Sequence, residues 1–137
     1  MLFRSNALSI MDEGHLAPLL SRLRALLERE GLRPASEHLV FTSGRVRAGY
    51  RVGEHLFGGL DGVFGIVHII GERPGTGHHT FSAYITAATG AAWGTPGKID
   101  HDITKVVSGI ANTALLPSAG ADETARLLVG LMQKAAP

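Results

Sequence analysis

The sequence predicts a single α/β domain with a mostly parallel sheet, and three observations carry that prediction. Residues 64–70 have the β-branched composition of a strand that is buried on both faces. Residues 16–27 and 125–132 repeat apolar side chains at helical spacing. The length of 137 residues, 45% of them apolar, is enough for one hydrophobic core and too short for two.

The first five residues look foreign to the rest of the chain. Leu2 to Ser5 reads Leu-Phe-Arg-Ser, the peptide that the end of a common sequencing adapter encodes. We therefore expect residues 1–5 to be a non-native leader, with the true N-terminus missing, and residues 6–137 to form the domain.

A helix is predicted over residues 16–27, where six leucines follow the i, i+3, i+4, i+7 rule and charged residues fill the other side. Asp12 and Glu13 near its start favour the helix dipole, and Gly31 follows its end as a cap. Packing against a sheet explains the leucine stripe, and binding to a partner is the alternative interpretation.

The middle of the chain is predicted to alternate between short strands and a helix. Residues 38–42 are expected to be a short strand, and residues 47–60 allow a short helix that Gly58 and Gly59 would end. The strand over residues 64–70 follows. Residues 81–86 alternate in polarity and are predicted to be another strand.

The last third is predicted to be a loop followed by helices. Residues 89–97 are expected to be a loop that holds the only tryptophan, Trp93, and residues 99–110 are expected to be partly helical. Asp122 is predicted to cap a closing helix with an apolar face that includes Leu128 and Met132.

Charged residues follow the predicted central strand directly. Gly71, Glu72 and Arg73 are followed by Pro74 and Gly75, which favour a rigid turn. Open α/β sheets bind ligands at the carboxyl ends of their strands, so these side chains are candidates for a binding site. The alternative interpretation is that Glu72 and Arg73 are ordinary surface charges beside a loop.

Several kinds of chemistry are not predicted. A net charge of +1 gives no argument for nucleic acid or an anionic membrane, and no apolar run is long enough to span a bilayer. The chain has no cysteine, which excludes disulfides and thiolate ligands. His78-His79 and Asp100-His101-Asp102 do not present two ligands to one ion, so no metal site is expected. Neither a nucleotide-binding motif nor a self-contained catalytic constellation is present.

The strand-end blocks together resemble the small subunit (light chain) of ethanolamine ammonia-lyase. Ile70 to Gly75 resembles that family's Ile/Val-Gly-Glu-Arg-Pro-Gly signature. Three further blocks resemble the family in the same order: Gly44-Arg45-Val46, Val52-Gly53-Glu54 and Tyr84-Ile85-Thr86. The similarity runs from about Asn6 to the closing helix, which would make this the C-terminal domain of a longer family chain.

The resemblance implies a fold, a cofactor and a partner. The fold would be a Rossmann-like three-layer sandwich with a mostly parallel sheet. The chain would help to hold adenosylcobalamin against a large β/α-barrel subunit within a higher hetero-oligomer. The large subunit would carry the catalytic residues and deaminate ethanolamine to acetaldehyde and ammonia. The expected location is the cytoplasm, or a bacterial microcompartment used in ethanolamine catabolism.

The family's cofactor-binding positions map onto Val46, Glu72 and Val106, and no catalytic residue is expected in this chain. Val106 stands where the family has a cysteine, within Thr104-Lys105-Val106 instead of Arg-Asn-Cys. This departure leaves open a divergent paralogue that acts on another substrate. A stand-alone Rossmann-like module that binds a small molecule or a protein, without enzyme activity, is the alternative from another class.

Overall fold

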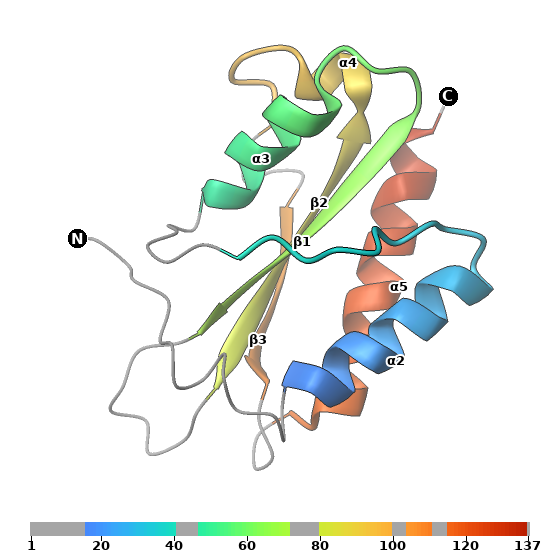
Figure 1. Cartoon of the computed structure of the whole chain (residues 1–137), viewed down its shortest axis with the longest axis vertical. Helices are drawn as coiled ribbons and strands as arrows, with labels where there is room; N and C mark the ends of the chain where they lie inside the picture. Colours follow the sequence, from blue (N-terminus) through green and yellow to red (C-terminus); the bar gives the residue numbers. More distant parts are fainter. Residues whose placement is uncertain (1–15, 41–46, 72–79, 100–103, 111–114, 137) are drawn as a thin grey trace.

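A computed structural model describes residues 16–40, 47–71, 80–99, 104–110 and 115–136. Its elements, in chain order, are α2 (Leu16–Arg29), α3 (Ala48–Phe57), β1 (Val63–Gly71), β2 (Phe81–Thr89), α4 (Gly90–Trp93), β3 (Thr104–Ile110) and α5 (Pro117–Ala135). Figure 1 shows the strands between α3 on one side and the pair α2 and α5 on the other. No helix of the described ranges is long and apolar enough to span a membrane.

The prediction of a mostly parallel, Rossmann-like sheet is wrong. The three strands lie in the order β1-β2-β3, and both pairings are antiparallel. Val63 pairs with Thr89 and Gly71 with Phe81, so β2 returns directly alongside β1. Parallel neighbours need a crossover of a dozen or more residues, usually a helix. Residues 72–80, between β1 and β2, are too few for such a crossover.

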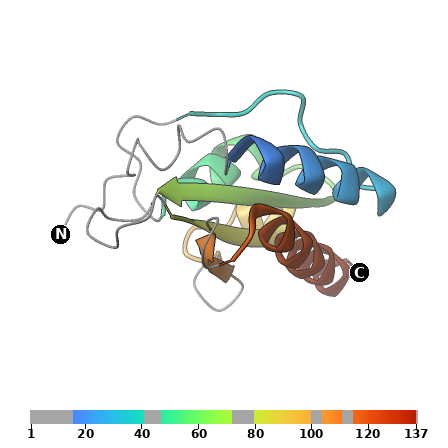
Figure 2. The ribbon, with the colours of Figure 1, turned by 90° about the horizontal axis from the view of Figure 1, so that it is seen from below.

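One face of the sheet packs against α2 and α5. The side chains of β2 that point to this face alternate along the strand, as a pleated strand requires. The buried side chains of this core are Leu19, Leu23, Leu27, Phe81, Ala83, Ile85, Ala87, Val107, Ile110, Ala121, Ala125 and Leu128. Figure 2 shows α2 and α5 side by side, and Arg22 on α2 forms an ion pair of 2.7 Å with Asp122 on α5.

The opposite face packs against α3 and α4 around Trp93. Its ring is fully buried, and its indole N–H donates a hydrogen bond of 3.1 Å to the carbonyl of Phe64 in β1. Gly53 lets α3 approach this ring, since a Cβ built there would lie 2.3 Å from Trp93 Cζ3. Phe57 stacks on Phe64 with ring centroids 4.7 Å apart and extends the cluster.

The helical predictions are confirmed near both ends of the chain and before β1. The leucine stripe forms α2 and buries Leu19, Leu23 and Leu27. The short helix expected within residues 47–60 is α3, which ends before Gly58. The closing helix is α5, although it begins at Pro117, five residues before the predicted cap at Asp122. Proline suits this first turn because its missing N–H would have no partner there.

The predictions between these helices are partly wrong. Residues 104–110, expected to be partly helical, form β3, because Val107 completes the α5-side core beside β2. The expected loop at residues 89–97 contains the single-turn helix α4, which Thr89 caps by accepting a hydrogen bond from the Ala92 N–H. His38 to Val40 are not in a strand, and Phe41 and Thr42 lie outside the described residues.

The strand over residues 64–70 is confirmed as β1, but its predicted place in the sheet is wrong. β1 is an edge strand in the described sheet, with residues 63–69 only half-buried. The interior strand is β2, which pairs on both sides and is buried at most positions. A continuous β-branched run is typical of buried parallel strands, but it also suits an edge strand that helices cover in part.

Candidate functional site

The structure describes one of the three predicted cofactor-binding residues. Val106 lies on β3 and is 45% exposed, and Lys105 and Ser108 on the same strand are exposed as well. Val46 and Glu72 lie outside the described residues. The residue after Val46 and the residue before Glu72 are described, however.

The chain approaches Val46 and Glu72 at the same end of the sheet. Gly71, the residue before Glu72, is the buried last residue of β1. The first turn of α3, which follows Val46, packs near that end of β1, since a Cβ at Gly49 would lie 3.1 Å from His68 Cβ. The second turn of α3 packs at Trp93, toward the opposite end. Two segments distant in sequence therefore meet at the carboxyl end of β1.

Val106 lies near this end, in a row of three paired residues, one on each strand: His68, Tyr84 and Val106. Tyr84 pairs with His68 on one side and with Val106 on the other. The rings of His68 and Tyr84 are 6.4 Å apart between centroids. With about 3.4 Å per residue along a strand and about 4.8 Å between strands, Val106 lies roughly 14 Å from Gly71. This spacing suits contacts with different parts of one large ligand.

The side chains of this row point to the face of the sheet that packs against α3, but α3 does not cover the row where it reaches β3. β1 contacts α3 through His68, whereas the side chain of Val106 on β3 is nearly half exposed to solvent. Next to it, the hydroxyl groups of Thr86 and Thr104 share a hydrogen bond of 2.9 Å, which satisfies this polar pair within the protein. The exposed part of the row is therefore apolar at Val106.

The described residues contain no metal site. No group of three histidine, aspartate or glutamate side chains converges among them. The resolved pKa shifts belong to two surface ion pairs: hydrogen bonds from Arg22 and Arg126 lower the pKa values of Asp122 and Glu123, respectively. With an exposed apolar side chain at Val106, the described arrangement can bind and orient a ligand.

Sequence reasoning missed the row, although a signal for it was present. His68 and Tyr84 lie at even positions of two strands in which odd positions point to the α2 and α5 side. Alternating polarity predicts the strand over residues 81–86. The strand over residues 64–70 is predicted from its β-branched composition as a parallel strand, so the alternation of its side chains is not used there. Sequence reasoning also missed a cavity lined by lysines at the other end of the sheet.

The comparison with known families gives one match. The family model described as ethanolamine ammonia-lyase light chain (EutC) matches residues 5–136, nearly the whole chain. The search of curated proteins found no significant match.

Proposed function

The chain belongs to the ethanolamine ammonia-lyase light-chain family, and from this membership we propose that it helps to hold adenosylcobalamin against a larger catalytic subunit. A light chain acts with a larger subunit, so the lyase activity belongs to the complex. The reaction of that complex would convert ethanolamine into acetaldehyde and ammonia. The family match over residues 5–136 is the observation that carries this proposal.

In this proposal Glu72 is the polar contact to the cofactor. A corrin ring carries neutral amide arms, and a carboxylate can accept hydrogen bonds from their N–H groups. Glu72 directly follows the carboxyl end of β1, and Val46 precedes α3 at the same end. The position of these described neighbours supports a shared site for the two residues.

Val106 would supply apolar contact to the same ligand. Its side chain is 45% exposed on the sheet face that α3 leaves open, so a flat apolar surface can cover it without moving a helix. Valine retains the apolar contact of the family cysteine and lacks its thiol. In this proposal the carboxylate of Glu72 and the apolar side chains of Val46 and Val106 would hold the cofactor by its amide arms and its ring.

The protein and the cofactor have separate tasks in this account. When bound, adenosylcobalamin supplies the radical chemistry, which no protein side chain provides. The residues of this chain bind and orient it, and the larger subunit binds ethanolamine. We therefore expect this polypeptide alone to have no ammonia-lyase activity.

Reconstitution with the cognate large subunit tests the proposal. Ethanolamine and adenosylcobalamin are added to the chain alone, to the large subunit alone and to the co-expressed pair, and acetaldehyde is measured. The proposal expects turnover only from the pair. Turnover by the chain alone, or an inactive and unassociated pair, would contradict it.

A further inference from the structure

All three lysines of the chain line one cavity. The sequence contains only Lys98, Lys105 and Lys134, while its other strongly basic residues are arginines. The cavity has a volume of about 470 Å³ and lies between α5 and the end of β2, and Arg126 also lines it. This volume is within the range of about 300–1,000 Å³ that is usual for small-molecule sites.

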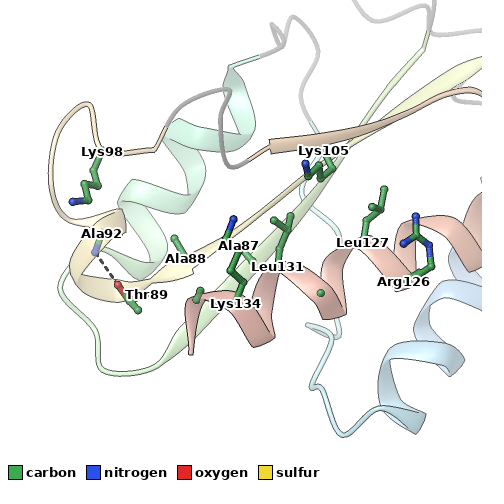
Figure 3. A pocket seen from close by; sticks show the side chains of 12 residues that line it. Ala87, Ala88, Thr89, Ala92, Lys98, Lys105, Arg126, Leu127, Leu131 and Lys134 are labelled. Atoms are coloured by element: carbon green, nitrogen blue, oxygen red, sulfur yellow. Dashed lines mark hydrogen bonds between the residues drawn. The ribbon is translucent and has the colours of Figure 1, made fainter. Parts of the chain in front are cut away.

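The lysines come from three different elements. Lys105 lies on β3 opposite Ile85, so its side chain leaves the sheet on the α5 side. Lys134 lies near the end of α5, and Lys98 follows α4. Figure 3 shows Lys134 reaching from α5 toward β2 in the space between Lys98 and Lys105. The fold therefore brings Lys134 to the two lysines that are distant from it in sequence.

The charged side chains that are described around the cavity are all basic. Among the described residues, its lining contains no aspartate or glutamate, and Arg126 is already paired with Glu123 on the same helix. None of the three lysines forms an ion pair within the described ranges. Three positive charges without an acidic partner in the described part of the chain repel each other, and a bound anion would offset that repulsion.

The floor of the cavity is aliphatic. Ala87, Leu127 and Leu131 lie between the basic side chains, and none of the described lining residues is aromatic. A nucleobase would find no ring to stack on, whereas an aliphatic body can cover the leucines. Lysine binds phosphate and carboxylate groups as a compact, mobile charge. We propose that this cavity binds a small organic anion with a phosphate or carboxylate head and a short aliphatic body.

This site is separate from the proposed cofactor site and does not depend on it. Ala87 and Thr89, at the end of β2, pair with Gly65 and Val63 at the start of β1. Gly71, the other end of β1, lies roughly 26 Å from Val63 at about 3.3 Å per residue, and Glu72 follows Gly71 in the sequence. Cofactor binding can therefore fail in a test while anion binding succeeds, and the reverse.

Lysine-selective labelling gives a direct test, because every lysine reports on the cavity. The full chain is reductively methylated with ¹³C, which keeps the lysine charge, and is titrated with hexyl phosphate. The three lysine methyl signals are expected to shift together, with a dissociation constant on the order of 1 mM or tighter. The methylated N-terminal amine is the internal reference. Hexanoate in a parallel titration distinguishes the two kinds of head group.

Two further arms test the head and the aliphatic body separately. Inorganic phosphate is expected to bind at least about tenfold more weakly than hexyl phosphate, and neutral hexanol should leave the signals in place. Lys98→Gln, Lys105→Gln and Lys134→Gln, each made singly, should weaken binding at least about threefold, as read from the two remaining lysines. The matched control, Arg29→Gln with Arg33→Gln and Arg51→Gln, removes three exposed charges outside the cavity and should leave the affinity unchanged.

Four outcomes would overturn the proposal. Equal binding of phosphate and hexyl phosphate would show charge attraction without a built site, as would equal weakening in the control variant. A lack of shifts would mean that the lysines are already neutralised, for example by Asp100 and Asp102, which lie between Lys98 and Lys105 in the sequence. Shifts caused by the large subunit or cobalamin, with none from hexyl phosphate, would assign the cavity to the complex.

Discussion

Trp93 is the side chain around which the α3 side of the protein is packed. It is fully buried, and Gly53 of α3 lies against its ring. Gly53→Ala would place a Cβ 2.3 Å from Cζ3, and the ring is held by its hydrogen bond to Phe64. We expect the variant to lose about 1–3 kcal/mol of unfolding free energy, the usual cost of overpacking a core.

Gly130→Ala is the matched control for this substitution. Gly130 also lies within a helix, but a Cβ there meets nothing within 4 Å. Alanine should therefore stabilise α5 by about 0.5–1 kcal/mol. Chemical denaturation of both variants measures the difference, and equal stability of the two would contradict the packing of α3 against Trp93.

Thr124 gives a second prediction at this scale. It is fully buried in α5, and its hydroxyl has no hydrogen-bond partner within the described part of the chain. Thr124→Val keeps the shape and removes the unsatisfied group, so it should leave stability unchanged or raise it by about 1 kcal/mol. Thr124→Ser keeps the hydroxyl and loses a methyl group, so its melting temperature should fall. A clear loss of stability in the valine variant would show that the hydroxyl is bonded.

The chemistry of single residues was more predictable from the sequence than their arrangement. Glu72 and Arg73 were identified as candidates because charged groups follow a β-branched run. The lysine cavity could not be identified in this way, since Lys134 is far in sequence from Lys98 and Lys105. Only the packing of α5 beside β2 and β3 brings them to one cavity.

At the scale of elements, one ion pair joins α2 to α5. The hydrogen bond from Arg22 lowers the pKa of Asp122 below its ordinary value of 3.8, and the same bond raises the pKa of Arg22. A carboxyl group with a lowered folded-state pKa adds stability above its unfolded pKa and loses it as the pH falls through the folded value. The contribution of this exposed pair should be small.

Asp122→Asn tests that pair. The variant should be slightly less stable than the natural chain at neutral pH, and the difference should disappear as the pH falls below about 3.8. Glu123→Gln is the control, because Glu123 pairs with Arg126 within α5 and does not join two helices. Thermal melting between pH 7 and pH 2 measures both effects. A difference that grows toward low pH would contradict the ion pair.

Helices were predicted better than sheet topology, and the reason is physical. The leucine spacing of α2 depends on one face of one helix, which the local sequence records. Strand direction depends on which segments meet. The connection over residues 72–80 allows β2 to return beside β1, and a parallel sheet had been expected from the composition of β1 alone. The helical prediction for residues 104–110 was wrong because their valines suit a helix or a strand, and only the pairing with β2 decides for a strand.

At the scale of the whole molecule, the described surface fits a subunit that acts with a partner. Leu39 and Val40 are 60% and 84% exposed in the segment after α2, and Leu56, Leu60 and Leu116 are also exposed. Leu39 and Val40 are adjacent in the sequence, and exposed apolar side chains that lie together are typical of surfaces that contact other proteins. We expect the chain alone to self-associate or to bind a hydrophobic dye.

Leu39→Ser combined with Val40→Ser tests the role of this surface. Because both side chains are mostly in water, the melting temperature should stay close to that of the natural chain. Dye binding and association with the large subunit should both decrease, as measured by fluorescence and by size exclusion with light scattering. A large fall in melting temperature with unchanged association would show that the segment belongs to the core of the domain.

The most direct test of the proposed function is cobalamin titration of the complex with the large subunit. Glu72→Ala should weaken binding about ten- to a hundredfold, since a hydrogen bond to a charged group contributes about 1.5–3 kcal/mol. Glu72→Gln, which keeps an acceptor oxygen, should lie between, and Val106→Cys should preserve or tighten binding. Melting temperatures should remain unchanged. Equal affinity for the natural chain and Glu72→Ala, together with a lower melting temperature, would make Glu72 a structural residue and contradict the account.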